Sequence, residues 1–171
     1  CGGGFFNAGQ MCSATSRVLV AEELADEFLL RLQTRAEAIR VADPFDPNVE
    51  MGALVNQAQY QRVLGHIDRG LSSGAKLICG GNRPANLPRG YFLQPTVFTE
   101  VPLDSALWCE EIFGPVLCVR SFASEAEAIA LANDSPFGLV ASAVTRDGAA
   151  ADRSVVRLSL RSLPGRDAVR R

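Results

Sequence analysis

Residues 5–17 of this chain read FFNAGQMCSATSR, and this stretch decides how the rest of the sequence is interpreted. It is rich in Gly, Ala and other small residues, so residues 1–17 are predicted to form a loop with close backbone approaches. Cys12 lies in this stretch, and residues 16–20 directly after it predict a short apolar strand. In such a loop a thiol can face a cleft while backbone N–H groups converge on a substrate oxygen. Because a small cysteine in a tight loop is also common as a packing residue, the local pattern leaves both roles open.

Outward from this loop, helix and strand patterns alternate along the chain. Apolar residues at a spacing of three to four predict amphipathic helices over residues 21–41 and 57–72. Ser124 followed by Glu127 is a capping-box pattern, which predicts a third helix that runs through Ala132. Short apolar segments predict four further strands, at residues 75–79, 92–98, 116–122 and 138–144. This alternation predicts an α/β fold in which helices flank a largely parallel sheet.

The composition excludes several classes of protein. With 171 residues, 47% of them hydrophobic, the chain is long enough to bury a sizeable core and too apolar to be disordered throughout. Its net charge of −2 argues against nucleic acid or anionic lipid as a partner, and its apolar runs are too short for a transmembrane helix. Five widely spaced cysteines and one histidine argue against a disulfide framework and against a metal site. Such thiols suit a reducing intracellular compartment.

The last twenty residues differ from the rest of the chain. Residues 152–171 contain six Arg and two Asp, so a basic tail follows an acidic body. Apolar residues in this tail are interleaved with Ser and Arg, and the regular alternation of elements ends near residue 148. A boundary is therefore predicted near residue 150, with residues 151–171 forming an Arg/Ser-rich tail that is disordered or misframed.

Two motifs give the sequence a resemblance to a known family. Residues 5–17 resemble the active-site segment of the aldehyde dehydrogenase superfamily, Phe-x-Asn-x-Gly-Gln-x-Cys followed by small residues and Arg. Residues 110–116, EEIFGPV, resemble that family's Glu-x-Phe-Gly-Pro cofactor motif and lie at a similar separation from the cysteine. Within the superfamily, residues 10–17 and 114–119 are similar to the plant betaine-aldehyde and aminoaldehyde branch. The resemblance covers residues 4–150 and implies a partial catalytic domain of the aldehyde dehydrogenase type over residues 1–150.

The resemblance also implies a role for each site residue. Cys12 is the expected nucleophile, which attacks the aldehyde carbon to give a thiohemiacetal and then a thioester. Glu111 is expected to accept hydrogen bonds from the nicotinamide ribose hydroxyls, and Phe113 to pack near the nicotinamide. Phe6 is expected to line the aldehyde channel, although many relatives have Trp at this position, and no metal is expected.

The function implied by the resemblance is NAD-dependent oxidation of betaine aldehyde or an aminoaldehyde to the acid. NADP is an alternative cofactor, and the expected partners are a small-molecule aldehyde and, in a full-length form, further copies of the chain. The cytoplasm, a plastid or a peroxisome would suit such an enzyme. Because the family's cofactor-binding half and general-base segment precede the cysteine motif, the chain is expected to be a fragment that is inactive alone. Two alternatives remain open: a non-catalytic remnant or binding protein with the same fold, and a cysteine-dependent ester hydrolase.

Other chemically distinctive residues are expected to be structural. His66 is predicted to be half-buried on the surface of an amphipathic helix. Cys79 and Cys118 fall in strand patterns and are predicted to be core residues. Core packing is also favoured for Cys109, with a second thiol near the pocket as the alternative. Glu110 is expected to face solvent or a structural partner.

Overall fold

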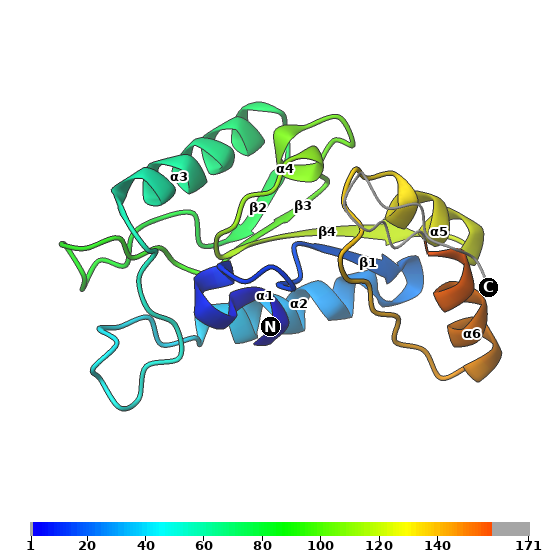
Figure 1. Cartoon of the computed structure of the whole chain (residues 1–171), viewed down its shortest axis with the longest axis horizontal. Helices are drawn as coiled ribbons and strands as arrows, with labels where there is room; N and C mark the ends of the chain where they lie inside the picture. The colour runs from blue at the N-terminus through cyan, green and yellow to red at the C-terminus, as the bar shows by residue number, and fades with distance from the viewer. Residues whose placement is uncertain (1, 159–171) are drawn as a thin grey trace. The chain divides into compact units, whose positions relative to one another are not determined.

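The computed structural model describes residues 2–158 (Figure 1), which divide into two compact units, one up to Ser121 and the other from Phe122. In those described residues, no helix combines the length and the apolar character that crossing a membrane requires.

The first unit is built around a four-stranded sheet. Its strands are β1 (Arg17–Ala21), β2 (Lys76–Cys79), β3 (Thr96–Thr99) and β4 (Val116–Phe122), arranged in the order β1-β4-β3-β2. β3 pairs with β4 in parallel, and β2 at the edge pairs with β3 antiparallel. The expected fold class, an α/β domain with a mostly parallel sheet flanked by helices, is confirmed.

Helices cover both faces of this sheet. A 3-10 turn, η2 (Glu22–Leu24), leads into α2 (Ala25–Glu37), which packs against β1, β2 and β3. α3 (Gln57–Ser72) and the short α4 (Ala106–Cys109) pack against each other, and Figure 1 shows α2 and α3 on opposite sides of the strands. Asn56 caps α3 by accepting a hydrogen bond from the Gln59 N–H at 2.9 Å. The cap begins α3 one residue after Asn56 and so sets which residues face the sheet.

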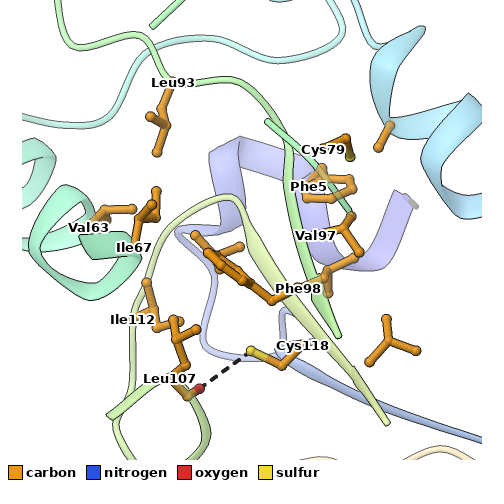
Figure 2. Packing of buried hydrophobic residues seen from close by; sticks show 14 of the residues in the cluster. Phe5, Val63, Ile67, Cys79, Leu93, Val97, Phe98, Leu107, Ile112 and Cys118 are labelled. Carbon is orange, nitrogen blue, oxygen red and sulfur yellow. Dashed lines mark hydrogen bonds between the residues drawn. The ribbon is translucent and has the colours of Figure 1, made fainter. Parts of the chain in front are cut away.

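The core lies on both sides of β3. Figure 2 shows Val97 and Phe98 pointing to opposite sides of the strand, with Phe98 toward Val63 and Ile67 of α3. Cys79 and Cys118 are buried, as predicted, and the Cys118 Sγ lies 3.5 Å from the Leu107 carbonyl oxygen. Burial raises the pKa of the Cys118 thiol to about 12, so this cysteine remains a neutral core residue.

Several predicted element boundaries are wrong, and tertiary contacts explain them. Residues 2–9, predicted as loop, form helix α1 (Gly2–Phe5) and a 3-10 turn, η1 (Phe6–Gly9), because the buried Phe5 ring anchors this segment in the core. α2 ends at Glu37 and not at residue 41, since Val41 forms a bridge with Met51. β3 begins only after Pro95, whose missing N–H cannot join a strand ladder.

The strand predicted at residues 138–144 is absent. This segment contains no helix or strand, and Leu139, Val140 and Val144 are exposed. An apolar segment forms a strand only when a neighbouring strand takes up its hydrogen bonds, and no strand among residues 2–158 pairs with it.

The second unit contains α5 (Glu125–Asn133) and α6 (Gly148–Arg157). The predicted capping box is confirmed: the Glu127 N–H donates to Ser124 Oγ, and the Ala123 N–H donates to Glu127 Oε2. α6 lies where the sequence predicts that order ends, and its Arg153 forms two hydrogen bonds to the Glu125 carboxylate. Helical structure therefore continues through residue 157, into the tail predicted over residues 151–171. The part of that tail after residue 158 lies outside the described residues, and the boundary at residue 150 stays a prediction.

Candidate active site

The loop that carries Cys12 is folded by a run of left-handed backbone. Asn7, Ala8 and Gly9 have φ angles of 50°, 55° and 69°, which non-glycine residues seldom adopt. Two reciprocal hydrogen bonds hold this run: the Asn7 side-chain amide donates to the Gln10 carbonyl at 3.1 Å, and the Gln10 amide donates to the Asn7 carbonyl at 3.2 Å. Gln10 Oε1 also accepts from the Val55 N–H at 2.9 Å, which ties the loop to the segment just before α3.

Cys12 itself lies at the exposed end of this loop. The Ala14 N–H donates to the Met11 carbonyl across a tight turn that contains Cys12, and its thiol is exposed. The Thr15 N–H then donates to the Gly3 carbonyl, so α1 supports the return of the chain toward β1. Within the described residues, the Cys12 backbone N–H donates to no protein acceptor. A thiol and a free N–H are therefore presented together at an open surface.

Residues 110–115, EEIFGP, form a second irregular segment between α4 and β4, here called the EEIFGP segment. Ile112 is buried, whereas Glu111 is exposed and Phe113 keeps 36% of its surface accessible. Phe113 has a φ of 54°, again in the left-handed region. Gln59 on α3 donates to the carbonyls of Ile112 and Phe113, at 3.0 Å and 2.8 Å.

Gly9 and Gly114 bring the two irregular segments into backbone contact. A Cβ atom placed on Gly9 would overlap the Gly114 carbonyl, so no residue with a side chain fits there. The cysteine loop and the EEIFGP segment are far apart in sequence, yet here they touch. The structure thus brings Cys12, Glu111 and Phe113 onto neighbouring segments of one unit.

Comparison with known proteins shows which family the chain resembles. Residues 1–161 match the sequence profile of the aldehyde dehydrogenase family. The chain belongs to this family. It is 46% identical over 145 residues to a chloroplastic betaine aldehyde dehydrogenase of Amaranthus hypochondriacus, covering 85% of this chain and 29% of the relative. A chloroplastic aminoaldehyde dehydrogenase of Arabidopsis thaliana is 45% identical over 151 residues, which is 88% of this chain and 30% of that protein.

A solved structure shows the same likeness at the level of the fold. The structure of Staphylococcus aureus betaine aldehyde dehydrogenase in complex with NAD+ has a TM-score of 0.90 and 38% identity, covering 92% of this chain and 32% of that one. The chain therefore spans about a third or less of the length of the aldehyde dehydrogenases that it matches.

The residues predicted to contact a cofactor are accessible in this structure. The Glu111 carboxylate has no hydrogen bond or ion pair with another described residue, so its oxygens are available to ribose hydroxyls. The exposed Phe113 ring offers an apolar surface beside it. Phe6, which is predicted to line the aldehyde channel, is 62% exposed. Among residues 2–158, no group of three or more His, Cys, Asp or Glu side chains is placed to hold a metal ion.

Two predictions about neighbouring residues are wrong. His66 is buried with 1% exposure, because it lies on the face of α3 that meets α4 and Glu110. Cys109 is exposed and not part of the core, and its Sγ lies 3.0 Å from the Leu103 carbonyl oxygen. Glu110 is a structural partner, as expected: its carboxylate lies 3.3 Å from Arg69 and 3.8 Å from His66 Nε2.

The structure also shows supporting residues that the motifs do not reveal. Gln59 and Arg62 of α3 donate to backbone carbonyls of the EEIFGP segment, with Arg62 2.7 Å from the Glu111 carbonyl oxygen. The available signal is a polar stripe at residues 59, 62, 66 and 69, one face of a helix whose other face is apolar. The spacing alone does not name its partner, since that partner is about fifty residues away.

Proposed function

We propose that this chain carries the nucleophile and the nicotinamide-side cofactor contacts of an NAD-dependent aldehyde dehydrogenase that oxidises betaine aldehyde or an aminoaldehyde. The observation that carries the proposal is the backbone contact between Gly9 and Gly114, which holds the cysteine loop against the EEIFGP segment. The names of the relatives support the aldehyde class, and the NAD+ complex of the S. aureus enzyme supports the cofactor.

In this proposal Cys12 reacts first. Its thiolate attacks the aldehyde carbon, and the carbonyl oxygen becomes an oxyanion of a thiohemiacetal. The Cys12 backbone N–H donates a hydrogen bond to that oxyanion, which is the kind of fixed dipole that stabilises developing charge. The aldehyde approaches past Phe6, whose exposed ring forms an apolar wall.

Glu111 and Phe113 orient the cofactor. The Glu111 carboxylate accepts hydrogen bonds from the ribose hydroxyls, and the Phe113 ring packs against the nicotinamide end. When bound, NAD+ would supply the acceptor for the hydride that leaves the thiohemiacetal carbon, and loss of that hydride leaves a thioester on Cys12. Water then releases the acid from the thioester on Cys12, with a general base that a full-length form contributes from outside this chain. Homo-oligomerisation of such a form and the inactivity of this chain alone stay predictions.

A chimaera tests the proposal. The matching segment of the Amaranthus enzyme is replaced by the corresponding residues of this chain, and NADH formation from betaine aldehyde is measured. Cys12→Ser is expected to lower kcat at least about a thousandfold. Glu111→Gln is expected to raise KM for NAD+ about tenfold, because an amide is a weaker acceptor than a carboxylate.

Cys109→Ser is the matched control, since Cys109 is also an exposed cysteine but lies outside the proposed chemistry. It is expected to keep kcat within about twofold. A folded chimaera that keeps its activity after Cys12→Ser would contradict the proposal. A folded chimaera that hydrolyses a nitrophenyl ester without NAD+ but forms no NADH would favour the ester hydrolase. Absence of both activities would favour the remnant.

A further inference from the structure

Four polar residues of α3 form a stripe along the helix face that meets the EEIFGP segment. Gln59, Arg62, His66 and Arg69 are spaced by three, four and three residues, so they share one face of α3. Each contacts a residue of the EEIFGP segment: Gln59 contacts Ile112 and Phe113, Arg62 contacts Glu111, and His66 and Arg69 contact Glu110.

The contacts of Gln59 match the unusual backbone of Phe113. In extended backbone, consecutive carbonyls point in opposite directions, whereas in the left-handed conformation they point to the same side. With φ at 54°, the carbonyls of Ile112 and Phe113 both come within reach of the single Gln59 amide nitrogen. Both hydrogen bonds are made in this conformation, so Gln59 stabilises it.

The side chains of the same segment are divided between the core and the site. Ile112 is buried and belongs to the same apolar cluster as Val63 and Ile67 of α3 (Figure 2). Because the backbone of residues 111–113 is bound through its carbonyls, the Glu111 carboxylate and the Phe113 ring need no contact with α3. They stay exposed for a ligand.

The same region of the chain also holds the cysteine loop. The N–H of Val55, two residues before α3, donates to Gln10, and Gly9 touches Gly114. α3 and the residues before it therefore bind both irregular segments and set their register against each other.

We propose that Gln59 and Arg62 are positioning residues, which hold Glu111 and Phe113 in place for the cofactor by binding the carbonyls of residues 111–113. The role in cofactor binding rests on the proposed function. The effect on the backbone of Phe113 does not, so the two are tested separately.

The first experiment uses the 171-residue chain and the variant Gln59→Glu, which keeps the length of the side chain but removes its N–H donors. At positive φ a residue's own amide and α protons come close together, so the intraresidue nuclear Overhauser effect of Phe113 reports its conformation. We expect the intensity of this Phe113 signal to fall at least about twofold in the ionised variant at pH 7.5. The reason is that the introduced carboxylate repels the two carbonyl oxygens to which the Gln59 amide donates hydrogen bonds.

Lowering the pH gives a reversible rescue. When the introduced carboxyl takes up a proton, it regains one O–H donor, and the Phe113 signal is expected to return as the pH falls toward about 4, where an ordinary glutamate side chain is largely protonated. Gln61→Glu is the matched control, because Gln61 is an exposed residue of the same helix and receives the same charge. The Gln61→Glu variant contains the same native titrating groups as Gln59→Glu, His66 included. Only the difference in the Phe113 signal between the two variants is therefore interpreted.

The second experiment places both variants in the Amaranthus chimaera. Gln59→Glu is expected to raise KM for NAD+ about tenfold while kcat changes less than about threefold, since the cofactor contacts move and Cys12 does not. Gln61→Glu is expected to leave both parameters within about twofold.

The outcomes separate the two proposals. An unchanged Phe113 signal in folded Gln59→Glu, or a loss that is the same at every pH, would overturn the positioning role. A changed signal together with an unchanged KM in an active chimaera would overturn the link to the cofactor. If the chimaera with native Gln59 forms no NADH, the proposed function fails, while the Phe113 signal still decides whether Gln59 holds the backbone.

Discussion

Glycine is required at position 9 for two reasons: its backbone conformation and its close approach to another segment. Its φ of 69° is left-handed, and a side chain at this position would overlap the Gly114 carbonyl. Neighbouring Asn7 and Ala8 also have positive φ angles, so the turn before Cys12 already contains strained backbone. A side chain at position 9 would therefore fit only if the cysteine loop or the EEIFGP segment moved.

We expect Gly9→Ala to lower the free energy of unfolding by about 2–5 kcal/mol, from overpacking against fixed backbone and from the unfavourable φ. Gly65→Ala is the matched control, because Gly65 lies in α3 with no atom near the position of an added Cβ. That variant is expected to gain about 1 kcal/mol from helix propensity. Denaturant unfolding followed by circular dichroism measures both. Equal stability of the two variants would show that the Gly9–Gly114 contact is not tight in solution.

At the scale of the element, α3 combines an apolar face with a polar stripe that binds a distant segment. His66 lies where the two meet, buried against α4 and beside Glu110. Burial lowers the pKa of His66 from its ordinary value of 6.5, and the neighbouring Arg69 and Arg62 lower it further, while Glu110 opposes them. The folded chain therefore keeps His66 neutral at a pH at which the unfolded chain protonates it.

This difference predicts a pH dependence of stability. As the pH falls through 6.5, the unfolded state binds a proton that the folded state does not, so the free energy of unfolding decreases, by at most about 1.4 kcal/mol per pH unit. We expect this decrease between pH 7 and 5.5, and we expect His66→Gln to remove it. The carboxyl groups of Asp46, Glu50 and Glu125, whose pKa values are lowered by hydrogen bonds, contribute only at lower pH, near their ordinary values of 3.8 and 4.5. An identical slope in the variant would assign the pH dependence to other groups.

At the scale of the whole molecule, the reactivity of the cysteines reports which parts of the chain are buried from solvent. Cys12 and Cys109 are exposed, whereas Cys79 and Cys118 are buried in the sheet. Burial raises the pKa of both buried thiols, in Cys118 to about 12, so both remain largely protonated at neutral pH. The reactive thiolate is therefore scarce at Cys79 and Cys118, and reagents also reach it slowly.

We expect N-ethylmaleimide at pH 8 to modify Cys12 and Cys109 at least about a hundredfold faster than Cys79 and Cys118. Peptide mass spectrometry gives the rate at each cysteine separately. In guanidinium chloride the four rates are expected to converge, which controls for intrinsic differences between the peptides. Fast modification of Cys118 without denaturant would mean that the sheet is open in the isolated chain.

The sequence alone allows much of the fold to be predicted, because several of its signals are local. The period of the apolar residues predicts α3 with its observed limits, and the Ser124–Glu127 pair predicts the start of α5. The apolar, β-rich run that opens residues 116–122 predicts β4, and its first four residues are buried, as in a strand covered on both faces. The two motifs likewise predict the family and single out Cys12, Glu111 and Phe113.

What only the tertiary structure decides depends on contacts between distant residues. The strand predicted at residues 138–144 is absent because a strand needs a partner, and His66 is buried because α4 and Glu110 cover it. The pairing of Gln59 with the carbonyls of Ile112 and Phe113 depends on a left-handed φ that no local pattern predicts. Local sequence determines which residues can form a helix, a cap or a nucleophile. Which of them meet is determined by packing, since Gly9 and Gly114 are distant in sequence and touch only in the folded chain.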